Sequence, residues 1–231
     1  MRLDKYLCDA GYGTRSEIKK LIKEKIVYVN DELVTKPDYK VNEENDIVFV
    51  GDEQVEYKKF VYYMLHKPSG YISATEGNVP LVVDLVPSTY KGLFPVGRLD
   101  KDTEGLLLIT NDGQLAHDLL APKKHVDKEY YVECRDKLTQ EMVKHFESGM
   151  QLSDGTTFAK ADCISVQDYS CHLILHEGKY HEIKRMFEAE GNLVTYLKRI
   201  RMKNLILDEN LKKGEYRELT LDELNDLKKD V

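Results

Sequence analysis

Three carboxylates and one arginine stand close together in the segment Gly-Arg-Leu-Asp-Lys-Asp-Thr-Glu-Gly, residues 97–105. A carboxylate in such a cluster can act as a nucleophile, and several carboxylates together can bind a hard cation such as Mg²⁺. The apolar run Leu106–Ile109 and an Asn-Asp-Gly turn follow directly, a pattern that predicts a buried strand. We therefore expect Asp100, Asp102 and Glu104 to lie in a loop that a sheet holds in place, a common setting for catalytic groups.

The size and composition of the chain favour a small module joined to a larger one. The chain has 231 residues, of which 42% are hydrophobic and 32% are charged, which suits a packed core in a soluble protein. No apolar run approaches the length of a membrane span, and the first residues lack the apolar core of a signal peptide. We expect a cytoplasmic protein with no membrane partner.

The cysteines and histidines do not have the spacing of a metal site. The four cysteines are scattered without a Cys-x-x-Cys pair, which also argues against a disulfide framework. The seven histidines are dispersed, and His172 and His176 flank an apolar run typical of a strand, so we interpret them as core or rim residues. The sequence therefore predicts no metal.

The distribution of charge indicates a polyanionic partner, although the net charge is −7. Residues 1–25 hold seven basic and four acidic side chains, and residues 178–203 hold seven basic and three acidic ones. The acidic residues are concentrated in residues 31–56 and after Asp208. Two separated basic segments on an acidic chain favour a polyanion, although composition alone is also consistent with two solvated faces.

Apolar spacing near the N-terminus predicts a compact module of two helices and short strands. The helices are expected at about residues 2–10 and 14–24, and strands at 26–29 and 47–50. Residues 51–59 are polar and charged and are expected to form a linker.

Several short motifs in this module resemble the small RNA-binding domain named after ribosomal protein S-four. They are Arg-Leu-Asp-Lys-Tyr-Leu at residues 2–7, Gly-x-Gly-Thr-Arg-Ser at 11–16 and Val-x-Val-Asn at 27–30. The resemblance implies that the two helices present basic side chains to structured RNA, and the candidate phosphate contacts are Arg2, Lys5, Arg15, Lys19, Lys20 and Lys23. The alternative is an ordinary helix pair with a solvated lysine face.

The rest of the chain alternates strands and helices without a regular repeat. Strands are expected at residues 61–65, 71–73, 106–109, 129–134, 164–166, 172–176, 193–200 and 205–207, and helices at 81–86, 114–120, 139–148, 180–190 and 221–227. Because strands outnumber helices and often follow one another directly, we predict an α+β fold with a mixed, largely antiparallel sheet. The expected domains are residues 1–58 and 59–231.

Three distant pieces of the second domain could carry chemistry together. They are the Gly-Arg-Leu-Asp segment at residues 97–100, the Lys-Glu-Tyr-Tyr-Val segment at 128–132, and the glycine turn and basic helix start at 177–186. Each piece alone has a simpler explanation: a surface ion pair, a core aromatic residue or a solvated basic face. A match of several motifs in order is far more specific than any one of them.

These pieces resemble the pseudouridine synthases, in particular the branch typified by the small-subunit rRNA enzyme RsuA. The motifs His-Lys-Pro-Ser-Gly at 66–70, Phe-Pro-Val-Gly-Arg-Leu-Asp at 94–100, Thr-Glu-Gly-Leu-Leu-Leu at 103–108 and Thr-Asn-Asp-Gly at 110–113 look like family signatures. The resemblance covers nearly the whole chain, because that branch carries the same small RNA-binding domain at its N-terminus.

The resemblance implies a role for individual residues. Asp100 would be the catalytic carboxylate, which attacks the target uridine or assists departure of the base from its ribose. The other implied site residues are Arg98, which fills the stack after base flipping, Tyr130, which stacks on the uracil, Ile183, which packs under it, Lys184, which pairs with the aspartate, and Arg185, which contacts RNA. Asp102 and Glu104 are assigned to structure, and Glu182 replaces the glutamine that the family often has.

The function that the resemblance implies is isomerisation of a specific uridine to pseudouridine in 16S ribosomal RNA, free or in an assembling small subunit. The enzyme would act as a monomer and need no cofactor. Three alternatives stay open: an enzyme acting on 23S rRNA, a non-catalytic RNA-binding protein of ribosome assembly, and a magnesium-dependent nuclease that uses the three carboxylates.

Overall fold

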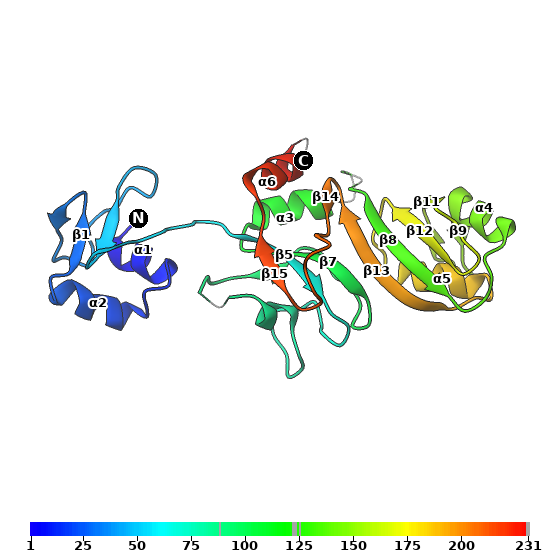
Figure 1. Ribbon diagram of the computed structural model, residues 1–231, viewed down its shortest axis with the longest axis horizontal. Helices are drawn as coiled ribbons and strands as arrows, with labels where there is room; N and C mark the ends of the chain where they lie inside the picture. Colours follow the sequence, from blue (N-terminus) through cyan, green and yellow to red (C-terminus); the bar gives the residue numbers. More distant parts are fainter. Residues whose placement is uncertain (88, 122–123, 125, 230–231) are drawn as a thin grey trace. The chain divides into compact units, whose positions relative to one another are not determined.

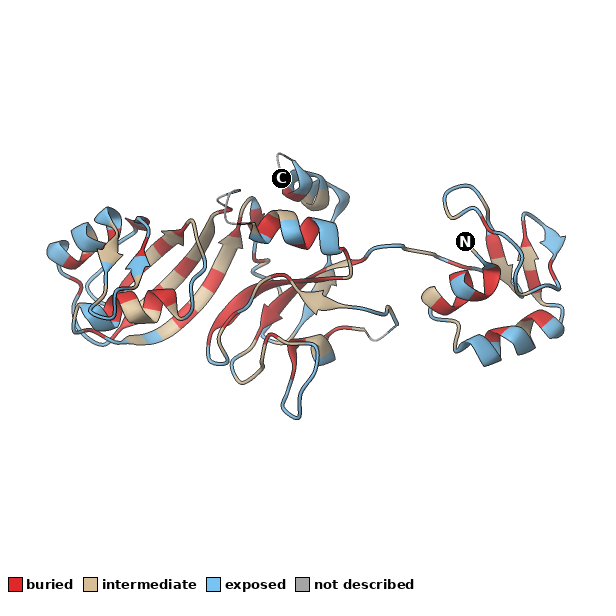
Figure 2. Cartoon of the chain, turned by 180° about the vertical axis from the view of Figure 1, so that it is seen from behind, coloured by how far each residue is buried: buried red, intermediate tan, exposed pale blue. Residues whose placement is uncertain are grey.

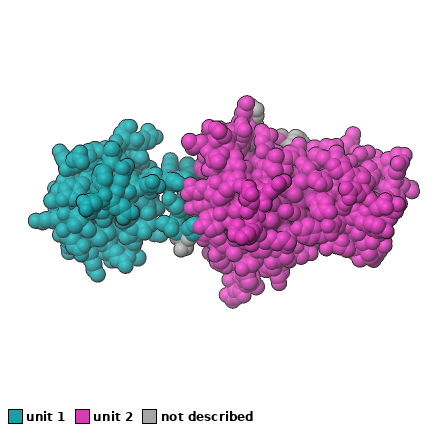
Figure 3. Space-filling model, viewed as in Figure 1, with its two compact units in different colours: residues 1–61, 87–92 teal, residues 62–86, 93–231 magenta. Residues whose placement is uncertain are grey.

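The structure is a computed structural model that describes residues 1–87, 89–121, 124 and 126–229. The chain divides into two compact units (Figure 3). The first comprises residues 1–61 and 87–92, and the second comprises residues 62–86 and 93–231. Residues 59–61 and 87–92, which the sequence assigns to the larger domain, thus group with the first unit.

The first unit packs two helices against a small antiparallel sheet. The helices are α1 (Leu3–Asp9) and α2 (Arg15–Lys23), and the strand order is β2 (Glu32–Leu33), β1 (Val27–Val29), β3 (Val48–Val50) and β4 (Glu53–Gln54). Thr14 begins α2 with a capping box, in which its side chain accepts a hydrogen bond from the backbone N–H of Glu17. The expected linker at 51–59 was wrong in part, because β4 continues the sheet there.

The second unit is built on a sheet of nine strands in the part of the chain that the structure describes (Figure 1). Its main path runs β11-β12-β8-β13-β7-β5-β15, with β14 beside β13 and β6 beside β7. Every described pair is antiparallel except β13 with β7, so the predicted mixed, largely antiparallel sheet is confirmed. The strands are β5 (Tyr62–Lys67), β6 (Phe94–Pro95), β7 (Glu104–Thr110), β8 (Lys128–Cys134), β11 (Ala161–Ile164), β12 (Ser170–Leu175), β13 (Val194–Met202), β14 (Leu205–Ile206) and β15 (Tyr216–Glu218).

Helices border this sheet, and a separate two-stranded sheet lies beside it. The helices are η1 (Val82–Leu85), α3 (Gly113–Leu120), α4 (Gln140–Ser148), α5 (Glu182–Ala189) and α6 (Leu221–Lys228), and the small sheet pairs β9 (Met150–Gln151) with β10 (Thr157–Phe158). The rings of Phe146 in α4 and Phe187 in α5 pack with centroids 5.0 Å apart. Another apolar core lies around β7 and α3, where the strands are largely buried (Figure 2).

Some sequence expectations were wrong in detail. Glu104 belongs to strand β7 and not to the loop, because β7 begins two residues earlier than its apolar run. Residues 71–73 form no strand and contribute a single bridge, from Ile72 to Leu81. The strand expected at 164–166 ends at Ile164, since Ser165 adopts a left-handed turn with φ +52°.

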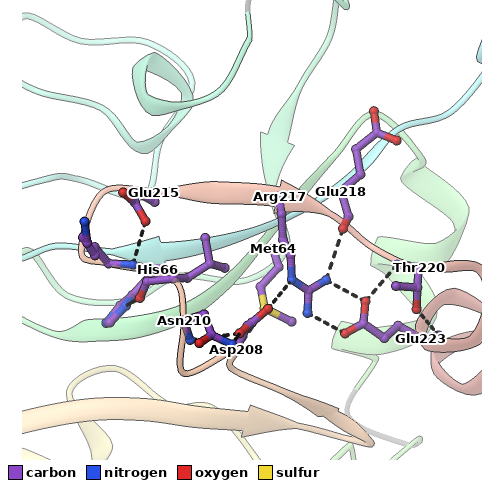
Figure 4. A network of polar contacts seen from close by, with 11 residues as sticks. Met64, His66, Asp208, Asn210, Glu215, Arg217, Glu218, Thr220 and Glu223 are labelled. Atoms are coloured by element: carbon purple, nitrogen blue, oxygen red, sulfur yellow. Dashed lines mark hydrogen bonds and ion pairs between the residues drawn. The ribbon is translucent and has the colours of Figure 1, made fainter.

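The chain closes against β5 through strand β15 and an arginine network (Figure 4). Arg217 donates from Nε to Asp208, and its two Nη groups donate to the carboxylate of Glu223 at 2.7 and 2.8 Å. Such bidentate pairing fixes both direction and distance. The network therefore ties the last strand to helix α6, in which Glu223 lies.

The parallel contact between β7 and β13 depends on Gly105. This glycine has φ +104°, and a β-carbon at its position would lie 2.1 Å from the carbonyl oxygen of Arg199. No other residue type fits both the backbone angle and the close approach. Gly105 thus allows the two halves of the sheet to meet, with Arg199 directly opposite it in the register.

Candidate active site

A pocket in the second unit gathers the residues that sequence motifs singled out. Its lining comes from five places along the chain: the loop before β7, the end of helix α3, strand β8, the start of helix α5 and strand β13. The predicted residues on its wall are Arg98, Asp100, Tyr130, Ile183 and Lys184. Among them Tyr130 and Ile183 are buried, whereas Arg98 is exposed.

The loop that carries Asp100 is held from beneath by a buried lysine. Nζ of Lys67, at the end of β5, donates to the carbonyls of Pro68, Lys101 and Thr103 at 3.1, 3.2 and 2.7 Å. Burial lowers the pKa of Lys67 to about 8, and the acidic residues around it counteract only part of that effect. Lys67 is therefore a shared donor to three backbone carbonyls and holds the loop of Asp100 in place.

A second contact fixes the residue just before Asp100. The hydroxyl of Ser73 donates to the carbonyl of Leu99 at 3.0 Å and accepts from the N–H of Leu99 at 3.1 Å. Because both backbone groups of Leu99 are bound by one side chain, the directions of Arg98 and Asp100 are set on either side of it.

Lys184 of helix α5 lies between two carboxylates of the loop. Its Nζ is 3.0 Å from Oδ2 of Asp100 and 2.6 Å from Oδ1 of Asp102. Burial disfavours the charge of Lys184, but the two carboxylates outweigh burial and raise its pKa. Likewise burial of Asp102 is outweighed by Lys184, so the pKa of Asp102 is lowered. The cluster thus holds a lysine cation beside Asp100.

His181 reaches Asp100 from the other side, although no sequence motif indicated a role for it. Its Nε2 lies 3.4 Å from Oδ1 of Asp100. The ring of His181 also stacks on Tyr180, with centroids 3.8 Å apart, and Tyr180 itself is 74% exposed. In the sequence, His181 lies within the tract at 179–186 that resembles the family, but the resemblance assigned no role to it.

The inner wall of the pocket combines apolar and basic side chains. Tyr130 and Ile183 are joined there by Leu197 and by two residues to which sequence motifs assigned no role, Lys128 and Arg199. Arg199 is 2% exposed, and its Nε donates to the carbonyl of Leu106 at 2.8 Å. Burial, together with repulsion from Arg199, lowers the pKa of Lys128. Such a wall suits a ligand in which a flat, uncharged ring is attached to an anionic group.

Glu182 supports the turn that carries His181. It is 4% exposed, and its Oε2 accepts from the N–H of Lys179 at 2.8 Å. Burial and the neighbouring carboxylate of Glu177 raise the pKa of Glu182 to about 7, although the bond from Lys179 acts in the opposite direction. In its protonated form, Glu182 can donate a hydrogen bond toward Glu177, as a glutamine amide would.

The remaining basic candidates divide into engaged and free side chains. Arg2 is bound by Asp4 through two hydrogen bonds, Lys5 pairs with Asp9, and Arg185 donates to Asp154 and Thr156. Four side chains of α2 are exposed and make no ion pair with any residue that the structure describes: Arg15, Lys19, Lys20 and Lys23. A basic helix face of this kind suits contacts with phosphates.

The carboxylates of Asp100, Asp102 and Glu104 do not converge on one point. Asp100 and Asp102 share Lys184, whereas Glu104 accepts from the hydroxyl of Tyr196 and pairs with Lys213, each at 2.7 Å. An ammonium group therefore occupies the place where a cation ligand cage would have to form. This arrangement counts against a magnesium-dependent nuclease and favours chemistry by a single carboxylate.

No helix among the residues that the structure describes is both long and apolar enough to cross a membrane.

Two family models match the chain. The model described as RNA pseudouridylate synthase matches residues 61–189, and the one described as the S4 domain matches residues 1–48. The first contains the loop of Asp100, strand β8 and helix α5, and the second contains both helices of the first unit.

Several curated proteins are similar over nearly their whole length. An uncharacterised RNA pseudouridine synthase of Bacillus subtilis, YtzG, is 45% identical, with 97% of each chain covered. Ribosomal small subunit pseudouridine synthase A of Haemophilus influenzae is 36% identical, over 99% of this chain and 100% of its own. Ribosomal large subunit pseudouridine synthase B of B. subtilis is 38% identical, over 98% of this chain and 95% of its own.

A solved structure agrees with these similarities. A crystal structure of a pseudouridylate synthase superposes with a TM-score of 0.70 at 33% identity, and the match covers 98% of this chain and 99% of that one.

Proposed function

Because the chain belongs to the RNA pseudouridylate synthase family, we propose that it converts a specific uridine of 16S ribosomal RNA into pseudouridine. Asp100 is the proposed catalytic residue. The single observation that carries this proposal is the position of Asp100, which is ion-paired to Lys184 at 3.0 Å in a pocket that Tyr130 and Ile183 also line.

The proposed chemistry breaks and re-forms the bond between base and ribose. As the base leaves, positive charge develops at C1′ of the ribose, and an adjacent carboxylate can stabilise or trap that carbon. Lys184 holds the carboxylate of Asp100 in place for this task through their ion pair. Tyr130 is proposed to stack on the detached uracil and Ile183 to pack against it, so that the base stays in the pocket while it turns.

Arg98 is proposed to act on the RNA and not on the detached base. It is exposed at the wall of the pocket, one residue before the anchored Leu99. A base inside a helix must be flipped out at a cost of a few kcal/mol, and a guanidinium plane that fills the vacated place offsets part of that cost.

The choice of 16S RNA rests on similarity to small-subunit enzymes. A relative of that name aligns with the whole chain at 36% identity, and the segment Lys179–Met186 resembles that branch. The second candidate is 23S RNA, which the relative named for the large subunit favours at 38% identity. We propose that the protein acts in the cytoplasm as a monomer without a cofactor, on rRNA that is free or in an assembling small subunit.

The proposal is tested by mapping pseudouridines in rRNA. Cells lacking the gene are expected to lose one pseudouridine in 16S RNA, and the wild-type gene is expected to restore it. A loss confined to 23S RNA would instead support the second candidate, and an unchanged map would contradict both.

The variant Asp100→Asn separates catalysis from binding. It is expected to leave the modification absent while the purified protein still binds rRNA transcripts with an affinity close to that of the wild type. Modification by this variant would overturn the role of Asp100. Restoration of ribosome assembly by Asp100→Asn without modification would indicate a non-catalytic assembly protein.

A further inference from the structure

The start of helix α5 is built unlike the other capped helices of this chain. Thr14, Asp112, Thr139 and Thr220 have an extended backbone, and the side chain of each accepts a hydrogen bond from the first turn of its helix. His181 occupies the same position at α5 with φ +49° and ψ +34°, and its side chain makes no capping bond. The left-handed conformation is uncommon for residues other than glycine, and such conformations concentrate at functional sites.

This unusual backbone directs the imidazole toward the reacting groups. Nε2 of His181 lies 3.4 Å from Oδ1 of Asp100, and the ring is supported by the stacked Tyr180. His181 also lines the pocket, together with Tyr130 and Ile183. In an ordinary capping conformation the side chain would bond to the first turn of the helix. The side chain of His181 makes no such bond and lies on the pocket wall instead.

The proposed reaction needs a group that accepts a proton. Isomerisation joins C5 of uracil to the ribose in place of N1, so C5 must lose its hydrogen and N1 must gain one. Among the described side chains on the pocket wall, Arg98, Lys128, Lys179, Lys184 and Arg199 are cationic and have no free lone pair.

The acidic side chains of the pocket are also engaged. Asp100 is assigned to C1′ of the ribose in the proposed function, and Glu182 is buried beneath the turn and bound to the backbone of Lys179. A neutral imidazole can both accept and return a proton near neutral pH.

We propose that His181 is the general base that removes the proton from C5, and that its imidazolium returns a proton to N1. This proposal rests on the proposed function, because it concerns a later step of the same reaction at the same site.

Atoms and electrons balance in this step. The bond between N1 and C1′ breaks with its electron pair on N1, and C5 then attacks C1′ with the C5=C6 pair while N1 forms a double bond to C6. Nε2 of His181 takes the proton from C5, the C5–H pair restores C5=C6, and the electron pair returns to N1. N1 then takes up one proton, so that the base changes its point of attachment but not its composition.

The test uses His181→Asn and rRNA transcripts carrying either hydrogen or deuterium at C5 of uridine. Asparagine tolerates the left-handed conformation, so the turn is retained, but it cannot act as a base. The single-turnover rate is expected to fall by about 100-fold. The deuterium isotope effect on that rate is expected to be larger than in the wild type, because proton removal becomes limiting.

Two further variants test whether His181 serves only as a stacking surface. Tyr180→Leu removes the stack and keeps the imidazole, so it is expected to weaken RNA binding without changing the isotope effect. His181→Gly is expected to recover activity when imidazole is added to the solution. An isotope effect in His181→Asn equal to that of the wild type, or no recovery with imidazole, would overturn the proposed base.

The wild-type protein distinguishes the two proposals. Suppose that the wild type forms pseudouridine in the transcripts, but that His181→Asn leaves the isotope effect unchanged or imidazole does not restore His181→Gly. Only the role of His181 is then overturned. If the wild type forms no pseudouridine in 16S or 23S RNA, either free or in subunits, the proposed function fails and the base fails with it.

Discussion

Lys184 and Asp100 form an ion pair, with Nζ 3.0 Å from Oδ2, that joins helix α5 to the loop before β7. The two residues come from opposite sides of the contact between β7 and β13. The pair therefore orients the carboxylate in the pocket that both residues line.

Replacing Lys184 by methionine is expected to lower kcat by about 100-fold or more, a size typical of losing one charged group that stabilises a reacting centre. Without Nζ, Asp100 and Asp102 both lose the ion-pair partner that they share. Lys184→Arg should retain part of the activity. The measurement is single-turnover formation of pseudouridine, with Lys144→Met on the exposed side of α4 as the control. Full activity of Lys184→Met would contradict the prediction.

Glu182→Gln is expected to make the protein more stable above pH 7 than the wild type. The folded state raises the pKa of Glu182 from 4.5 to about 7, so it binds more protons than the unfolded state between these values. The stability that this group contributes is thus complete below about pH 4.5 and is lost as the pH rises through 7, with a range of about 3 kcal/mol.

The measurement for Glu182→Gln is thermal unfolding at pH 5 and pH 8. The variant is expected to resemble the wild type at pH 5 and to unfold at a higher temperature at pH 8. Glu188→Gln, at an exposed position of the same helix, is the matched control and should show no such difference. Equal midpoints of wild type and Glu182→Gln at pH 8 would show that folding does not raise the pKa of Glu182.

Lys67→Met is expected to lower the free energy of unfolding by about 2–4 kcal/mol, because it leaves the buried carbonyl of Thr103 without its donor and removes one of the two donors to the carbonyl of Lys101. The relief of removing a buried charge offsets part of the loss. Urea unfolding measures the change. Folded protein should also show faster amide exchange in the loop at 99–103, whereas unchanged exchange would mean that Lys67 does not hold this loop.

Reversing Lys19, Lys20 and Lys23 to glutamate is expected to weaken binding to rRNA and to reduce its dependence on salt. The logarithm of the affinity should fall less steeply with the logarithm of the salt concentration, by about one in slope for each phosphate that the helix no longer binds. The matched control reverses three exposed lysines of the second unit: Lys144, Lys160 and Lys212. An equal loss in both variants would indicate general repulsion and not a binding face on α2.

The sequence predicted the fold class well because the strands and helices follow local periodicity. The helices α2, α3, α4 and α6 follow a threonine or aspartate N-cap, a residue type that indicates a helix start in the sequence itself. Short strands such as β4 and β15 were not predicted, since they form by pairing with another strand and have no apolar pattern of their own.

The sequence predicted which residues form the site, but not the contacts and backbone conformations that hold them in place. Sequence motifs nominated Asp100, Tyr130, Ile183 and Lys184, and the structure brings these four into one pocket. The sharing of Lys184 with Asp102 and the left-handed backbone of His181 could not be read from the sequence. Both depend on how α5 packs against a loop far away in the chain, which no local pattern encodes.

The contact between Gly105 and Arg199 also sets an order of events during synthesis of the protein. Asp100 leaves the ribosome long before the partners that complete its pocket, and β13 is nearly the last strand of the sheet to appear. Domains generally fold in the order in which they are made, and distant pairings form last. A nascent chain can thus complete the two helices and the small sheet of its first unit early, while it gains an assembled reaction centre only once Arg199 has emerged.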